Sequence, residues 1–316
     1  MKNKRKRQKI FVLILLSLVL VMGGFQVYDY IKNIEKAEDV KYTAVIFNAP
    51  MQQSTEVLMI SANEEKDSVI DNESNVIQYS DLKNYKEENL ERYKAYHKKN
   101  PDLLDAEVIW RTNAKLDYDF YTNVEEVKDL DSITIVVNKY YKLPDNYEPE
   151  DLEIVEEEYY LRKEAKDAYL NLKEAIKEQD LGIQISSAYR SYASQEKLYN
   201  KTLNEQGKEA ADKLGARAGH SEHQTGLAVD VADDKAGFTP FGETEEYAWI
   251  KENAHRFGFI IRYREDPALL GYENEPWHLR YVGEEVAIDM YESNIHILEE
   301  YLDKKIIKDN EEANED

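Results

Sequence analysis

The stretch "SEHQTGLAVD", residues 221–230, places a histidine and an aspartate seven positions apart around a glycine. The residues after the glycine are typical of a short strand, in which side chains alternate between two faces. Ala228 and Asp230 then share one face, and apolar side chains such as Leu227 and Val229 occupy the other. A carboxylate on the small-residue face indicates the wall of a site, with the apolar face turned toward the core.

A second histidine lies in the strand-like stretch "ENEPWHLRYVG", residues 273–283. Alternation separates its tryptophan, leucine and tyrosine, which we expect to be buried, from His278 and Arg280 on the other face. Glu275 comes three residues before this histidine, and the proline after it favours an extended approach. The stretch therefore offers a second imidazole and a second carboxylate.

Two imidazoles and one carboxylate can hold a catalytic zinc ion and leave its fourth position open for water. His223, Asp230 and His278 provide this set, and the remaining positive charge of the metal would acidify the water. Glu275 stays free as a general base, because a metal-bound carboxylate cannot easily take a proton. Taken singly, each fragment fits a structural role better, but together they fit zinc chemistry.

Arg190 ends a third strand-like stretch, "ISSAYR". Its guanidinium could donate to a substrate carboxylate or to a developing oxyanion. The alternative is an arginine in a surface ion pair.

The stretches "SAYRSYASQEKLY", "GHSEHQTGLAVDV" and "EPWHLRYVG", in this order, closely resemble the zinc D-alanyl-D-alanine carboxypeptidases of the VanY type. The similarity runs from about residue 91 to residue 283. Ala188 and Ala218 depart from the residues that many relatives have at these positions, and neither is a proposed ligand.

The resemblance implies a role for individual residues of the site. It implies that one zinc ion per chain is bound by His223, Asp230 and His278, and that Glu275 is the catalytic base. It further implies that substrate is contacted by Arg190, Gln195 and Ser221. The implied reaction is hydrolysis of the terminal D-alanyl-D-alanine bond of peptidoglycan stem peptides.

Other functions remain open at this point. A related zinc L,D-carboxypeptidase or murein endopeptidase would use the same residues, and a non-catalytic cell-wall-binding module could keep the fold. Serine-type carboxypeptidases are a weaker alternative, because "SQEK" at 194–197 and "SDLK" at 80–83 match S-x-x-K without the S-D-N and K-T-G elements. The sequence leaves the oligomeric state undetermined.

Charge and the N-terminus indicate where the protein works. The formal net charge of −23 argues against nucleic acid as a partner. A basic segment at residues 1–9 precedes an apolar run at 10–28, which indicates a transmembrane anchor or an uncleaved signal in the lipid bilayer rather than a cleaved signal peptide. The positive-inside tendency then predicts a single-pass cell-membrane protein whose first nine residues are cytoplasmic and whose catalytic domain is extracellular.

The remaining organisation follows from composition and periodicity. We expect a stalk or small accessory module at 29–125, the zinc D,D-carboxypeptidase domain at 126–305 and an acidic tail at 306–316. "SITIVVNKYYKLP", residues 132–144, is strand-like, and apolar residues at helical spacing predict a helix over 161–175. Further helices are expected near 194–205 and from about 244. The mixture predicts an α+β fold with a small central antiparallel sheet flanked by helices.

Overall fold

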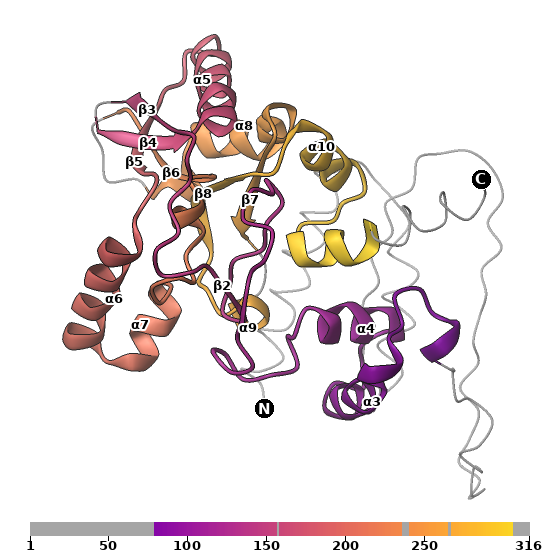
Figure 1. Ribbon diagram of the computed structural model, residues 1–316. Helices are drawn as coiled ribbons and strands as arrows, with labels where there is room; N and C mark the ends of the chain where they lie inside the picture. The colour runs from indigo at the N-terminus through magenta and orange to yellow at the C-terminus, as the bar shows by residue number, and fades with distance from the viewer. Residues whose placement is uncertain (1–78, 157, 236–239, 265–266, 306–316) are drawn as a thin grey trace, which may run out of the picture. The chain divides into compact units, whose positions relative to one another are not determined.

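The computed structural model describes residues 79–156, 158–235, 240–264 and 267–305 (Figure 1). The α-helices are α3 (Leu90–Lys99), α4 (Asp105–Asn113), α5 (Lys163–Lys177), α6 (Tyr192–Gln206), α7 (Lys208–Leu214), α8 (Glu245–Asn253), α9 (Pro267–Leu270) and α10 (Glu284–Glu292). The strands are β1 (Glu125–Glu126), β2 (Tyr141–Lys142), β3 (Leu152–Glu156), β4 (Tyr159–Arg162), β5 (Ile183–Ser187), β6 (Ala228–Asp233), β7 (Phe259–Tyr263) and β8 (Glu275–Tyr281). Short 3-10 turns include η3 (Glu222–Thr225), η4 (Phe241–Glu243) and η5 (Ala254–Phe257).

A four-stranded antiparallel sheet in the order β5-β6-β8-β7 forms the centre of the fold. Its inner strands are β6 and β8, although α8 and β7 lie between them along the chain. The sheet therefore joins motifs that are distant in the sequence. The mixed helix and strand architecture with small sheets confirms the expected α+β class.

Helix α5 packs against this sheet and carries the periodicity expected from the sequence. Its buried residues Ala165, Tyr169, Leu172 and Ile176 belong to the same apolar core as the strand residues of β6 and β8. Leu161, expected at the start of the helix, instead lies in β4, because that strand pairs with β3.

The other two expected helices are also present. The helix expected near residue 194 is α6, and the one expected from about residue 244 is α8. Thr244 caps α8, because its side chain accepts a hydrogen bond from the Tyr247 amide.

The prediction of a strand over residues 132–144 is largely wrong, since within this segment only Tyr141 and Lys142 pair with another strand. Backbone groups of the segment form hydrogen bonds with side chains instead of with a neighbouring strand. The Asn138 side chain accepts hydrogen bonds from the backbone amides of Tyr140 and Tyr141. Two carbonyls of the segment, those of residues 133 and 135, accept hydrogen bonds from Arg280. The segment still contributes to the apolar core, but side chains rather than a neighbouring strand satisfy the hydrogen bonding of its backbone polar groups.

Residues 79–125 contain α3 and α4, which enclose a small core of Tyr93, Val108 and Ile109. Asp303, near the end of the described chain, accepts hydrogen bonds from the side chains of Asn84 and Asn113. The end of α4 and the loop before α3 therefore contact the C-terminal helical residues directly. The domain boundary expected at residue 126 stays a prediction.

Several expectations fall outside the described residues. They are the basic segment at 1–9, the anchor at 10–28, the first part of the 29–125 segment and the tail at 306–316. Among the helices that the structure does describe, none combines the length and apolar character needed to cross a membrane.

Gly226 joins η3 to β6 in a left-handed conformation with φ of +68°, and a Cβ there would lie 2.8 Å from Leu152 Cδ2 and 3.0 Å from Arg162 Cγ. We expect Gly226→Ala to lower the free energy of unfolding by about 2–4 kcal/mol, because left-handed backbone strain and overpacking add. Urea denaturation measures the loss. A loss no larger than the roughly 1–2 kcal/mol of left-handed strain alone would show that packing around Gly226 is not tight.

Candidate active site

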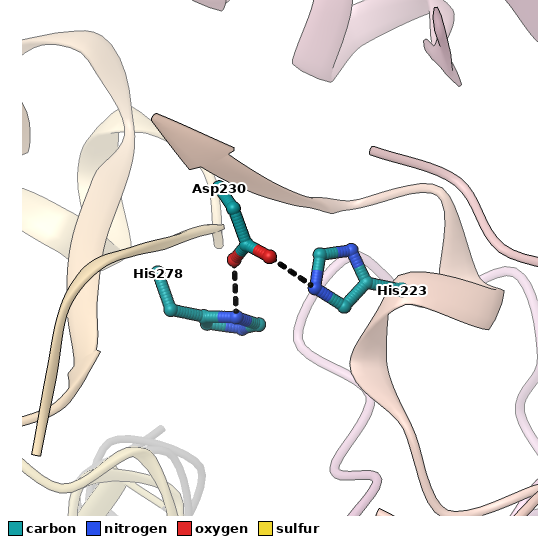
Figure 2. A group of neighbouring side chains, drawn as sticks. All are labelled: His223, Asp230 and His278. Carbon is teal, nitrogen blue, oxygen red and sulfur yellow. Dashed lines mark hydrogen bonds and ion pairs between the residues drawn. The ribbon is translucent and has the colours of Figure 1, made fainter. Parts of the chain in front are cut away.

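The sheet places Asp230 and His278 side by side. They are direct partners in the antiparallel ladder between β6 and β8, so their side chains leave the same face of the sheet. His223 comes from η3, which the turn at Gly226 folds back against the start of β6. Three side chains from separate elements thus converge on one point (Figure 2).

The carboxylate of Asp230 lies between the two imidazoles. Its Oδ2 is 3.2 Å from His223 Nε2, and its Oδ1 is 3.0 Å from His278 Nδ1. One ligand atom from each residue lies within 4.8 Å of the others, and among the described residues this is the group of three or more such side chains that could surround a metal ion. The donor set predicted from the sequence is therefore brought together.

The ring nitrogens that face away from this point have partners of their own. His223 Nδ1 is 2.7 Å from the carbonyl oxygen of Ala188, and His278 Nε2 is 3.3 Å from Glu222 Oε2. A carbonyl or ionised carboxylate can only accept, so each of these nitrogens carries the hydrogen. His223 Nε2 and His278 Nδ1 are then the nitrogens available to a metal.

In the metal-free site, the pKa values of the donor side chains are shifted from their ordinary values. Burial alone would raise the pKa of Asp230, but the two histidines outweigh it and hold that pKa far below its ordinary value. Burial lowers the pKa of His223. Burial would also lower the pKa of His278, but its hydrogen bonds to Asp230 and Glu222 outweigh that effect and raise the pKa to about 10. The site therefore attracts positive charge.

Glu275 begins β8 and stands just outside the donor set. Its Oε2 is 3.7 Å from His278 Nδ1. Burial raises the pKa of its carboxyl to about 7, against the lowering influence of His278. A carboxyl group with a pKa near neutrality is suited to take and return a proton.

Arg190 follows β5 and has a fixed orientation. Its Nη1 donates to Gln195 Oε1 at 2.7 Å, and its Nη2 donates to Ser187 Oγ at 2.5 Å. Gln195 in turn donates to the carbonyl of Ala216, so both polar atoms of its amide are used within the protein. Gln195 thus supports the guanidinium, and its expected contact with substrate stays a prediction.

The seven site residues predicted from the sequence all line one cavity of about 240 Å³. They are Arg190, Gln195, Ser221, His223, Asp230, Glu275 and His278. Their individual roles remain predictions.

His220, the other histidine of the motif, has partners of its own. Its Nδ1 is 2.7 Å from the Asn138 carbonyl oxygen, and its ring packs edge-on against Tyr121. It therefore contacts the 132–144 segment rather than the donor set.

The cavity has an apolar rim that corrects one expectation. Trp277 was expected to be buried with the leucine and tyrosine of β8, but it is 39% exposed. It lies where the register between β7 and β8 shifts, from Ile261 opposite Leu279 to Tyr263 opposite Glu275, so simple alternation does not hold at this residue. Leu198 of α6 and Leu214 of α7 are 46% and 54% exposed and line the same cavity. A polar floor is thereby bordered by three large apolar side chains.

Sequence reasoning missed Glu222, which lies inside the opening motif. It is fully buried and contacts Arg262, Arg280 and His278. A signal was present, because "FIIRY" and "HLRYV" each place an arginine in an apolar strand, and buried cations require a buried anion.

Comparison with known proteins agrees with this geometry. The VanY D-alanyl-D-alanine carboxypeptidase family matches residues 158–284. YodJ of Bacillus subtilis (strain 168), whose name describes a carboxypeptidase, is 40% identical over 196 residues, which are 57% of this chain and 71% of YodJ. A D-alanyl-D-alanine carboxypeptidase of Enterococcus faecium is 38% identical over 152 residues, 48% of this chain and 46% of that enzyme.

The solved structure of the LdcB LD-carboxypeptidase is also similar. It shares 38% sequence identity, matches 58% of this chain and 91% of its own, and superposes with a TM-score of 0.54. The likeness thus extends over most of YodJ and of LdcB. The chain belongs to the VanY family of D-alanyl-D-alanine carboxypeptidases.

Proposed function

We propose that this chain hydrolyses the terminal D-alanyl-D-alanine bond of peptidoglycan stem peptides with one zinc ion held by His223, Asp230 and His278. The observation that carries the proposal is the convergence of these donors in one cavity, with Glu275 Oε2 only 3.7 Å from His278 Nδ1. A pure binding module has no use for a free base at that place.

The donor set fits zinc. Two imidazole nitrogens and a carboxylate oxygen face one point, and the outward nitrogens are held by Ala188 and Glu222. When bound there, zinc would polarise the scissile carbonyl and lower the pKa of a coordinated water.

Glu275 takes the proton of the attacking water and then gives it to the leaving amine of D-alanine. Its buried position favours the neutral carboxyl after the first transfer, so the proton is kept in the cavity until the amine departs. Arg190 faces the same cavity with two of its nitrogens fixed, and it compensates negative charge on the scissile carbonyl or on the terminal carboxylate.

A second candidate differs only in the bond that is cut. LdcB, at a TM-score of 0.54, is an LD-carboxypeptidase, which favours a tetrapeptide stem as an alternative substrate. The donor set, the base and the arginine would serve either bond equally, because the chemistry at the carbonyl is the same.

The cellular placement is part of the proposal. A basic segment followed by an apolar run at 10–28 supports a single-pass anchor in the cell membrane, with the catalytic domain extracellular and close to newly made wall. These residues lie outside the described part of the chain.

The substrate can be tested with the full-length chain and synthetic tri-, tetra- and pentapeptide stems, with products identified by mass. We expect the pentapeptide to lose one D-alanine, the reaction to stop with a chelator, and zinc to restore it. Consumption of the tetrapeptide but not the pentapeptide would establish the LD alternative. Activity that persists in the chelator would refute the metal site.

Replacement of Glu275 by glutamine tests the base. We expect Glu275→Gln to bind zinc but to lose turnover by roughly 10²–10⁴-fold, the usual contribution of a general base. In the metal-free protein the same change should raise the free energy of unfolding at pH 8 by about 2–3 kcal/mol, because the pKa of Glu275 rises to about 7 in the folded state and its charged form is disfavoured there. The gain should vanish as the pH falls below the ordinary value of 4.5, where the carboxyl is protonated in both states.

Two variants serve as controls for this test. Glu273→Gln changes an exposed glutamate two residues away, and His223→Ala should lose the metal together with turnover. Retained turnover in Glu275→Gln would assign the base to another group.

The apolar rim contacts the part of the peptide that precedes the scissile bond. We expect Leu198→Ala to raise KM for the pentapeptide by roughly 3–10-fold, from about 1 kcal/mol of lost apolar burial, with kcat little changed. A blocked D-alanyl-D-alanine dipeptide lacks the stem residues that precede the scissile bond, so we expect the variant to hydrolyse it as the wild type does. Leu170→Ala, a similarly exposed leucine on α5 away from the cavity, is the matched control. Equal effects on both substrates would remove the rim from peptide binding.

A further inference from the structure

Glu222 is the centre of a buried charge cluster behind the active site. Its Oε1 accepts from Arg262 Nε at 2.9 Å and from Arg280 Nη1 at 2.8 Å. The side chains of all three residues are fully buried. The two guanidinium groups thus occupy one carboxylate oxygen and leave the other, Oε2, directed at His278 Nε2 at 3.3 Å.

The arginines are themselves held from several directions. Arg280 donates to the carbonyls of Ile133, Ile135 and Tyr281. Arg262 donates through Nη2 to Glu299 Oε1 at 2.6 Å. Because β7, β8, the 133–135 segment and the C-terminal helical residues all contribute, the Glu222 carboxylate has little freedom to turn away from the histidine.

A contribution to folding stability does not by itself explain why these charges are buried together. Buried ion pairs lose much of their attraction to desolvation, and well-packed apolar side chains of similar volume are often as stable or more so. An apolar core could not, however, give His278 a hydrogen-bond acceptor on the side away from the donor set. The cluster provides that acceptor and keeps it ionised between two cations.

We propose that Glu222 is a positioning residue, which accepts the Nε2 hydrogen of His278 and thereby turns the Nδ1 lone pair toward the metal position. This inference rests on the zinc site of the proposed function. It predicts that Glu222 acts on metal affinity, whereas a merely structural ion pair would act on folding stability alone.

Glu299 offers a matched control, because it is the other buried carboxylate bound to Arg262, and the hydrogen bonds and ion pairs described for it do not involve His278. In the full-length chain we compare Glu222→Gln with Glu299→Gln by zinc competition against a chelator and by urea unfolding of the metal-free protein. We expect both changes to lower stability, but only Glu222→Gln to weaken zinc binding by roughly 10–100-fold, the usual effect of losing such an outer partner. Equal losses of zinc affinity, or no loss in Glu222→Gln, would overturn the proposal.

A second measurement does not depend on the variants folding. In the zinc-loaded wild type, a long-range proton–nitrogen NMR spectrum should show His278 with hydrogen on Nε2 and metal on Nδ1. The reverse arrangement would refute the role of Glu222 directly. Zinc binding without peptide hydrolysis would refute the proposed activity and leave this inference standing, whereas a wild type that binds no zinc would overturn both.

Discussion

The direct pairing of Asp230 with His278 across β6 and β8 is the constraint on which the site depends. Antiparallel partners project their side chains from the same face of a sheet, so the backbone ladder sets the separation of the carboxylate and the imidazole before any side-chain contact forms. Slipping the register by one residue would turn one of the two to the opposite face. The core beneath, with Val229 and Leu279 on the other face, makes that slip costly.

Charge balance is the second requirement. Two buried arginines lie behind the donor set, and Glu222 and Glu299 compensate them within the protein. Because these two carboxylates balance the arginines, Asp230 is free to pair with the histidines and Glu275 is free to face the cavity. If Glu222 were absent, Arg280 would lose its carboxylate partner and only Glu299 would remain to balance two buried arginines, so their excess positive charge would oppose a divalent cation in the neighbouring position.

The cavity combines two kinds of surface with different tasks. Its floor holds Glu275, Arg190 and the three donors, which under the proposed function would act on the carbonyl, the water and the carboxylate of a peptide end. Its rim holds Leu198, Leu214 and Trp277, whose exposed apolar surface is available to a peptide rather than to the core. We therefore expect the α6–α7 pair and the start of β8 to select the peptide, and the sheet to carry the chemistry.

Local pattern in the chain was enough to predict the α+β class, helices α5, α6 and α8, and five of the residues that meet in the cavity, because periodicity and motif spacing are properties of short stretches. The other two, Gln195 and Ser221, were predicted only from the resemblance to the VanY family. Which side chains are covered was settled only by long-range packing. That packing placed Trp277 at the rim, left 132–144 irregular with carbonyls bound to Arg280, and enclosed Glu222 between two arginines. Burial of a charge or an aromatic ring depends on partners distant in the chain, and no local pattern specifies which partners those will be.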